Sequence, residues 1–337
     1  MNKIVFSIPV HEKPEVIFDQ IFNLKYFNPG CAVVLHISPV FLWDKSEIKR
    51  PQFEEIIKNI PDVYINSEQV RTGWLDIIQA HLSNYKFMRS KIDFEYFVLT
   101  ASNELYIKNG AYELISNYEA GFSTGRIINF NSVPSFAYRA ETDKALINII
   151  KEITNYKNEK EITQNIYSSQ VEGSFFSVKV FDEIFALTEK YFDYKNVKYL
   201  YQREEIYFGT IVKLTVPEEK IYTKNLTYTT NDLSYFYNFD FILNNYFSVK
   251  RVDREINNPI RAYIRDVLGG YRGDVQKICL SELKAFDRKD LEIYERHEKN
   301  NSKENFTRKI KNFIRRIKPV RFFIDRNKFI IAENNCV

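Results

Sequence analysis

The sequence predicts an α/β protein with a mostly parallel sheet, and its opening residues carry most of that prediction. Residues 3–10 are short, apolar and rich in β-forming side chains, so they predict a buried strand. Pro14 begins a predicted helix with apolar residues at helical spacing, and the Asn-Pro-Gly run at residues 28–30 ends it. Residues 32–37 (AVVLHI) form a continuous apolar run, typical of a strand covered on both faces. Strand, helix and strand in this order make a βαβ unit.

The same alternation continues along the chain. Helices are expected over residues 53–59, 74–85, 144–153, 182–192 and 206–214, and strands over residues 62–65 and 96–100. Residues 121–139 are predicted to be rich in loops, and residues 222–246 give no clear assignment. Because the sequence has no internal repeat and no low-complexity linker, we expect one domain over residues 1–302.

A basic segment, residues 303–337, follows that domain. Its lysines and arginines cluster in residues 303–321, and apolar residues recur there at i, i+3, i+4 and i+7: Ile310, Phe313, Ile314 and Ile317. This pattern predicts a basic amphipathic C-terminal helix. Two roles remain open for it: packing on the domain with a solvated charged face, and docking on an anionic membrane surface.

Composition and charge exclude several classes of protein. The formal net charge is only +4 over 337 residues, so we expect no nucleic-acid partner. Three cysteines, Cys31, Cys279 and Cys336, lie far apart, which argues against a disulfide framework or zinc site and favours a reducing compartment. No signal peptide is recognisable, and no run approaches the roughly 18 apolar residues of a membrane span. We therefore expect a cytoplasmic protein, peripheral at most at the inner face of the plasma membrane.

Three loops are candidate ligand sites, because open parallel sheets bind ligands beyond the carboxyl ends of their strands. They follow residues 3–10, 32–37 and 96–100, and the first two place His11 and His36 near the crevice. The sequence has neither G-x-G-x-x-G nor G-x-x-x-x-G-K-[ST], which excludes the usual dinucleotide and P-loop sites. It also lacks an Asp-x-Asp at a strand end, so we expect no divalent metal. Lysine and arginine side chains would then bind a diphosphate directly.

Two later segments could carry chemistry. Residues 172–176 (EGSFF) form a small-residue turn before an aromatic pair, and residues 203–210 (REEIYFGT) open a helix with two carboxylates. The carboxylates have two explanations: favourable interaction with the helix dipole, or catalysis. The rings of Phe175, Phe176 and Tyr207 could pack in the core or stack on sugar faces.

Taken in order, these segments resemble the core-2/I-branching β-1,6-N-acetylglucosaminyltransferase and peptide xylosyltransferase family over residues 1–215. Val10-His11 resembles the Val-His pair that ends the family's first strand, and His36-Ile37-Ser38 resembles its His-Val-Asp. The other matching positions are Gly73-Trp74 with Ala80 and Leu82, residues 99–103 (LTASN), Gly173-Ser174-Phe175-Phe176, and Arg203-Glu204-Glu205 with Phe208 and residues 209–211.

The resemblance implies a GT-A-type fold and an inverting, metal-independent transfer from a UDP-sugar, without a cofactor. It assigns the catalytic base to Glu205. Donor-nucleotide contacts are implied for Val10, His11, His36, Ser38, Gly73 and Asn103, and sugar or acceptor contacts for Gly173, Ser174, Phe175 and Glu204. Diphosphate binding is expected of Lys277, Lys284, Arg288 and Lys303.

The sequence departs from the family pattern at three positions. Ser38 and Asn103 stand where the family has Asp, and Arg203 stands where it has Pro. Ser38 and Asn103 lie at positions that contact the donor in the family, so these two changes concern which nucleotide base and which sugar this chain binds.

We therefore expect an enzyme that transfers GlcNAc or a xylose-like sugar to a hydroxyl group of a glycan or lipid-linked glycan, in surface-polysaccharide biosynthesis. The alternative is a catalytically degenerate protein of the same fold that binds glycans or serves as a scaffold. Ser38 and Asn103 favour this alternative, whereas Glu205 argues against it. A third interpretation is a peripheral membrane protein that acts mainly through its basic helix.

Overall fold

The structure, a computed structural model, describes most of the predicted domain. The described residues are 2–38, 48, 50–70, 72, 77–123, 126–127, 140–156, 158–192, 202–229, 239–256 and 258–269. All of them belong to one compact unit, Met1–Cys279. The basic segment and the predicted boundary at residue 302 lie outside the described residues, so both stay predictions.

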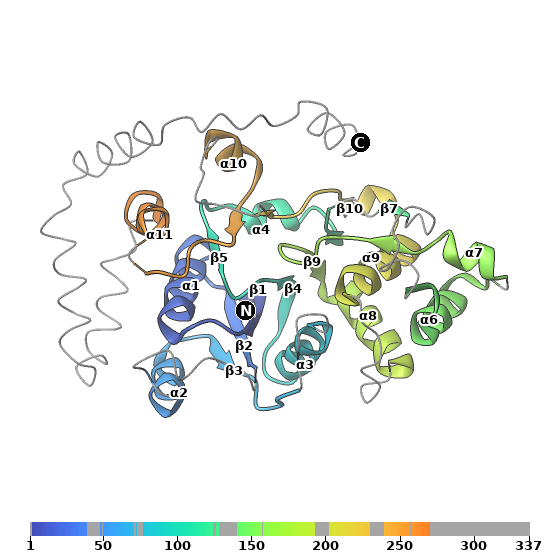
Figure 1. The fold of residues 1–337 in the computed structure, drawn as a ribbon, viewed down its shortest axis with the longest axis horizontal. Coiled ribbons are helices and arrows are strands. Elements are labelled where there is room, and N and C mark those ends of the chain that lie inside the picture. The colour runs from blue at the N-terminus through green and yellow to red at the C-terminus, as the bar shows by residue number, and fades with distance from the viewer. Residues whose placement is uncertain are drawn as a thin grey trace, which may run out of the picture. The chain divides into compact units, whose positions relative to one another are not determined.

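Strands and helices alternate through the first part of the unit, as the sequence predicts (Figure 1). These elements are β1 (Asn2–Val10), α1 (Pro14–Phe27), β2 (Ala32–Ile37), α2 (Arg50–Asn59), β3 (Val63–Ile65), α3 (Ile78–Arg89), β4 (Phe94–Leu99), β5 (Glu104–Tyr106), α4 (Ala111–Ile115) and β6 (Ala120–Gly121).

The remainder of the unit carries longer helices between short strands. These elements are β7 (Arg126–Ile127), α6 (Lys144–Thr154), α7 (Glu159–Thr163), β8 (Tyr167–Ser168), β9 (Phe175–Ser177), α8 (Val178–Tyr191), α9 (Glu204–Thr215), a 3₁₀ turn (Glu218–Lys220), β10 (Ile221–Tyr222), β11 (Thr227–Thr229), α10 (Phe239–Asn245), β12 (Ser248–Lys250), α11 (Pro259–Tyr263) and a π-helical turn (Ile264–Gly269).

A seven-stranded, mostly parallel sheet forms the centre, in the order β10-β6-β9-β4-β1-β2-β3. β1 pairs with β2 and β4 in parallel, and β2 pairs with β3 in parallel. β9 is antiparallel to both of its neighbours, β4 and β6. The predicted α/β class is confirmed, and the arrangement is consistent with the GT-A type.

Helices cover both faces of this sheet, because its central strands bury side chains on both sides. On one face, Val5, Val34 and Phe97 share a hydrophobic core with residues of α3, α6, α8 and α9. The alternate residues Phe6 and Val33 are also fully buried. Figure 1 shows α1 and α3 on opposite sides of the central strands. Burying each large apolar side chain contributes about 1.5–3 kcal/mol, so these strands contribute strongly to the stability of the unit.

Two sequence predictions of elements need correction. The helix expected over residues 74–85 begins at Ile78 and continues to Arg89, and residues 73–76 lie outside the described part. β9 was not predicted at all, because Phe-Phe-Ser is too short to show an alternating pattern. Its strand geometry comes from pairing with β4 and β6, which are distant in sequence.

A small sheet, in the order β11-β12-β5, is joined through one buried carboxyl group. Glu104 in β5 is fully buried and accepts hydrogen bonds from the hydroxyls of Thr227 and Ser248, both at 2.7 Å. The N–H of Ala101 donates to its other oxygen at 3.2 Å. Burial raises the pKa of Glu104 to about 7, outweighing these hydrogen bonds, which lower it. The Glu104 carboxyl group thus contacts side chains of both other strands, and it can hold a proton at neutral pH.

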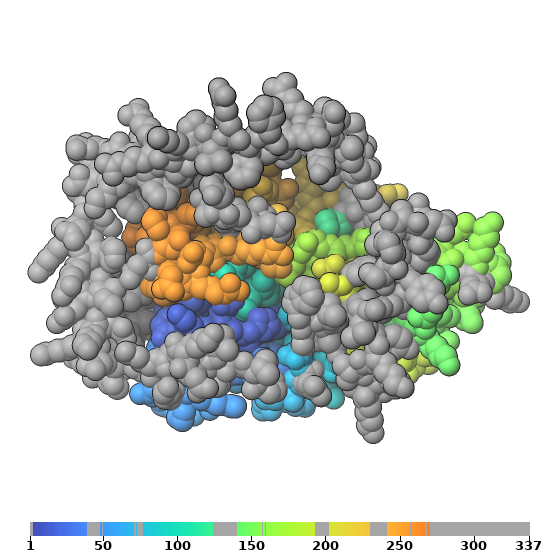
Figure 2. All heavy atoms as spheres, viewed as in Figure 1, coloured from blue at the N-terminus to red at the C-terminus, as the bar shows by residue number. Residues whose placement is uncertain are grey.

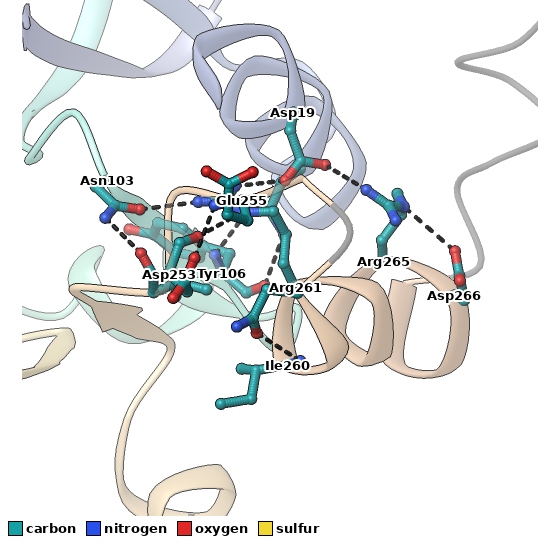
Figure 3. A network of polar contacts seen from close by, with 12 residues as sticks. Asp19, Asn103, Tyr106, Asp253, Glu255, Ile260, Arg261, Arg265 and Asp266 are labelled. Atoms are coloured by element: carbon teal, nitrogen blue, oxygen red, sulfur yellow. Dashed lines mark hydrogen bonds and ion pairs between the residues drawn. The ribbon is translucent and has the colours of Figure 1, made fainter. Parts of the chain in front are cut away.

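A buried network of ion pairs and hydrogen bonds connects α11 to α1 and to the loop after β4 (Figure 3). Arg261 is fully buried, and its Nη1 lies 2.5 Å from Oδ2 of Asp19 on α1. Its Nη2 donates to Oδ1 of Asn103, in the loop after β4, at 2.9 Å. Arg265 adds a second cation, with Nη1 3.5 Å from Oδ1 of Asp19. Each buried charge therefore has a partner, which buried charges require.

We predict that Arg261→Met lowers the free energy of unfolding by about 3–5 kcal/mol, because it leaves the Asp19 carboxylate buried with less compensation. Urea titration measures the change. Arg50→Met is the matched control, since it removes an exposed ion pair with Glu54 at 2.7 Å and should cost below about 1 kcal/mol. Equal decreases in the free energy of unfolding of the two variants would contradict a special role for the buried network.

A second prediction concerns Glu104 and pH. Because its pKa is raised to about 7 in the folded protein from the ordinary 4.5, folding is favoured below pH 4.5, and this contribution is lost as pH rises through about 7. Each pH unit by which the pKa differs between the folded and unfolded protein changes the free energy of unfolding by about 1.4 kcal/mol. Glu104→Gln should therefore flatten the decline in stability across this window. Urea titrations at several pH values test this, and an unchanged slope would count against it.

Candidate active site

The candidate site lies where loops leave the carboxyl ends of β1, β2 and β4. β1 and β2 end in register, with Val10 opposite Ile37, and the N–H of Ser38 donates to the carbonyl of Val10 at 3.2 Å. β4 lies on the other side of β1. At its end, the N–H of Thr100 donates to the backbone carbonyl of Ser7 at 3.1 Å. The predicted nucleotide-binding residues Val10, His11, His36, Ser38 and Asn103 thus lie along one edge of the sheet. Their contact with a nucleotide stays a prediction.

His36 is a neutral, fully buried group at the end of β2. Burial lowers its pKa to about 4. Its Nε2 accepts a hydrogen bond from the N–H of Val70 at 3.0 Å, which holds the segment after β3 against β2. In the neutral ring Nδ1 therefore carries the proton. Among the described residues no partner reaches this buried Nδ1, so it is a candidate donor to a ligand.

His11 follows β1 and faces charged residues from the loop after β12. Burial lowers its pKa; Glu12 opposes this effect, whereas Arg254 and Lys250 add to it. Arg254 Nε donates to Oε2 of Glu12 at 2.6 Å, although 65% of the Arg254 side chain is exposed. The loop after β12 thus closes on the carboxyl end of β1, a contact that sequence reasoning did not foresee.

Ser38 and Asn103, the two departures from the family pattern, differ in their surroundings. Ser38 accepts a hydrogen bond from the Thr72 hydroxyl at 3.4 Å and is almost entirely buried. Asn103 donates to the carbonyl of Val252 at 2.5 Å and accepts from Arg261. Its amide group therefore fixes the loop after β12, and this structural role accounts for the residue without a ligand.

The first turn of α9 is held in place by the segment around β8. The N–H of Ser169 donates to the carbonyl of Glu205 at 2.7 Å. A Cβ atom on Gly209 would lie only 2.9 Å from Oγ of Ser169, so glycine allows this close approach. Tyr207 donates to Oδ2 of Asp143, the N-cap of α6, at 2.8 Å. These contacts set the position from which the Glu205 side chain leaves the helix.

Residues 169–174, which we call the Gly173 turn, connect this helix to the sheet. The N–H of Gly173 donates to Leu99 at 2.8 Å, and its carbonyl accepts from Leu226 at 3.1 Å. Gly173 has φ of +79°, a conformation that favours glycine. An added Cβ would lie 2.2 Å from Oγ1 of Thr227 and 2.6 Å from its backbone nitrogen. Packing and conformation both require glycine here.

Glu205 is partly buried and shares its surroundings with an ion pair. Burial and, to a smaller extent, the Glu172 carboxylate raise its pKa to about 7, against the Lys250 ammonium, which lowers it. Glu172 and Lys250 form an ion pair with each other, with only 20% and 16% of their side chains exposed. Figure 2 shows the orange residues after β12 beside the yellow-green residues of the Gly173 turn. A carboxylate with a pKa near neutrality suits general base catalysis.

Of the two roles left open for the aromatic side chains, core packing is the one that their burial fits. Phe175 and Tyr207 are fully buried, and Phe176 is 1% exposed. Phe175 lies against Gly121, where an added Cβ would approach its ring to 2.1 Å. A ring in this position cannot reach a sugar without rearrangement of the sheet.

The other predicted sugar or acceptor residues are also largely enclosed. Ser174 is 2% exposed, and its hydroxyl donates to the carbonyl of Gln170 at 2.7 Å, within the Gly173 turn. Glu204, in the first turn of α9, is 5% exposed. Sugar contacts by Gly173, Ser174 and Glu204 stay predictions.

Several other predicted positions fall outside the described residues. They are Gly73 and the diphosphate-binding candidates Lys277, Lys284, Arg288 and Lys303. Within the described ranges, no cluster of three or more His, Cys, Asp or Glu side chains is arranged to hold a metal ion. Of the helices that the structure describes, none has the length and apolarity needed to cross a membrane.

Sequence reasoning missed Glu172, Lys250 and Arg254 as members of this region. Glu172 opens the EGSFF motif, so its neighbours gave a local signal. Lys250 and Arg254 lie in a stretch without a recognisable pattern, and they approach the site through pairing of β12 with β5 and β11. No local feature of the sequence could have indicated that pairing.

The sequence was compared with family models and with known proteins. The sequence matches no established family model. It is similar to chondroitin synthase of Pasteurella multocida (strain Pm70), with 26% identity over 135 residues. The similar region covers 38% of this chain and 13% of the synthase, so the chain matches a small part of that relative's length.

We predict that Gly173→Ala destabilises the protein more than Gly30→Ala does. Both glycines have φ of +79°, but no atom lies within 4 Å of a Cβ on Gly30. Gly30→Ala should therefore cost about 1–2 kcal/mol from backbone strain alone, and Gly173→Ala should cost more, because Cβ meets the backbone of Thr227. Urea unfolding of both variants measures the difference. Similar losses would show that the Gly173 turn can shift freely.

Proposed function

We propose that the chain is a glycosyltransferase, which moves a sugar from a nucleotide donor to a hydroxyl group of a glycan. Three observations support this proposal: the mostly parallel sheet with loops at its carboxyl ends, the similarity to chondroitin synthase, and the environment of Glu205. The last observation carries it. A partly buried carboxylate with a pKa near 7, which shares the neighbouring Lys250 with His11 at the end of β1, is suited to accept a proton from an acceptor hydroxyl.

The proposed reaction is a single displacement with inversion. The carboxylate of Glu205 takes the proton of the acceptor hydroxyl while that oxygen bonds to the anomeric carbon of the donor. The bond between the anomeric carbon and the diphosphate oxygen breaks, and the nucleoside diphosphate leaves with that electron pair. Cationic side chains stabilise the departing diphosphate. We assign that role to Lys277, Lys284, Arg288 and Lys303.

The finer assignments follow from the family resemblance. They comprise a UDP-sugar donor carrying GlcNAc or a xylose-like sugar, transfer without a divalent metal, and an acceptor that is a glycan or lipid-linked glycan. His11, His36 and Ser38 line the edge where the nucleotide would bind. We place the protein in surface-polysaccharide biosynthesis, at the cytoplasmic face of the membrane, with residues 303–321 toward anionic lipid.

The test measures turnover by a Glu205 variant. A panel of nucleotide sugars is first screened by thermal shift, because a ligand that binds the folded state raises its apparent stability. With the donor so found, Glu205→Gln should lower the rate of nucleotide release by about 10²–10⁴-fold and leave donor binding nearly unchanged. Glu219→Gln, at an exposed position beyond the other end of α9, is the matched control and should retain full turnover.

The outcomes separate the proposal from its alternative. Near-normal turnover by Glu205→Gln would rule out this residue as the base. Donor or glycan binding without turnover by the unmodified protein would favour a degenerate transferase that binds glycans. Ser38 stands where the family has Asp, and this departure supports that alternative.

A further inference from the structure

Beside Glu205 lies an ion pair to which the proposed reaction gives no role. Glu172 and Lys250 contact each other, and both act electrostatically on Glu205. The Nε2 of Gln170 donates to Oε2 of Glu172, and Lys250 contacts its other oxygen, Oε1. Both carboxylate oxygens of Glu172 are therefore engaged, which fixes the direction of the group.

The backbone holds both partners of this pair rigidly. Glu172 belongs to the Gly173 turn, and its carbonyl accepts a hydrogen bond from Asn225 at 3.1 Å. Lys250 is the last residue of β12, where it pairs with Glu104 on one side and Thr229 on the other. The Gly173 turn also holds the first turn of α9 through Ser169. The three charges thus come from three elements whose relative positions are set by hydrogen bonds.

We propose that Glu172 and Lys250 are positioning residues for the base: Glu172 retains the Lys250 ammonium and prevents it from pairing with Glu205. This inference rests on the proposed function, in which Glu205 must accept a proton. A lysine paired directly with Glu205 would stabilise the carboxylate and make it a weaker base. With Lys250 bound to Glu172, the Glu205 carboxylate keeps enough basicity to react with a hydroxyl group.

Other charged groups lie near the ion pair and near Glu205. Glu172 also faces the buried Glu104, and Lys250 also faces His11, which lies near Glu12 and Arg254. On its own helix, Glu205 follows Arg203 and Glu204, both largely buried. The positive end of the α9 dipole favours the Glu205 carboxylate, but burial raises its pKa to about 7 despite this. Glu172 and Lys250 are thus the charges through which the site can be adjusted.

The experiment reads the ionisation of Glu205 directly, by a carbon NMR titration of the full chain labelled at the glutamate carboxyl carbon. Glu205→Gln assigns the signal. We expect the Glu205 midpoint near pH 7 to fall by at least about one unit in Glu172→Gln, because Lys250 is then free to pair with Glu205. Lys250→Met should move it upward. Lys250→Arg retains the cation and should leave it near its original value.

Lys213→Met is the matched control, because it removes an ion pair with Glu218 at 3.6 Å near the other end of α9. It should not move the Glu205 midpoint. Shifts in the same direction for Glu172→Gln and Lys250→Met, or no shift in either, would overturn the inference. Circular dichroism confirms that each variant is folded, and the shift in Glu172→Gln gives the answer should Lys250→Met fail to fold.

Activity separates this inference from the proposed function. With a donor in hand, the acidic limb of kcat/KM should move with the NMR midpoint in each variant. Opposite NMR shifts without turnover of any nucleotide sugar would support the electrostatic arrangement and count against a transferase. Turnover whose pH profile ignores both substitutions would support the transferase and overturn the positioning roles.

Discussion

The Gly173 turn is the constraint on which the arrangement of the candidate site depends. Gly173 forms backbone hydrogen bonds with Leu99 at the end of β4 and with Leu226 in the loop before β11. Ser169, in the same turn, donates to the first turn of α9. Gly173 has both a positive φ and no room for a side chain. The position of Glu205 relative to the sheet therefore depends on a turn that only glycine can form.

Burial acts differently on the carboxyl groups of this protein. Asp19 is buried against two arginines, so its charge is compensated. Burial raises the pKa of Glu104 to about 7 although hydroxyls donate to it, and burial together with the Glu172 carboxylate raises the pKa of Glu205 to about 7. The charged carboxylate of Asp19 holds α11 in place, whereas Glu104 and Glu205 can gain or lose a proton near neutral pH. The surroundings, and not the residue type, decide which role a carboxyl group has.

The local pattern of the sequence was sufficient for the elements that bury continuous apolar runs. β1, α1, β2 and β4 lie close to their predicted positions, because each buries its apolar residues in one local segment. β9 and the strands between residues 221 and 250 are only two or three residues long, and their strand geometry comes from distant partners. The position of the Phe175 ring against Gly121 also comes from the pairing of β9, so the local sequence did not indicate it.

The sequence by itself determined the α/β class and the parallel pairing expected of the opening strands, because periodicity is a local property, whereas the candidacy of Glu205 came from a family resemblance. Only the tertiary structure decided what surrounds that carboxylate. Glu172 and Lys250 reach it from a turn and from a short strand, joined by pairings that no local pattern encodes. A pKa depends on burial and on charges brought near in space, so the chemistry of Glu205 could be assessed only once the chain was folded.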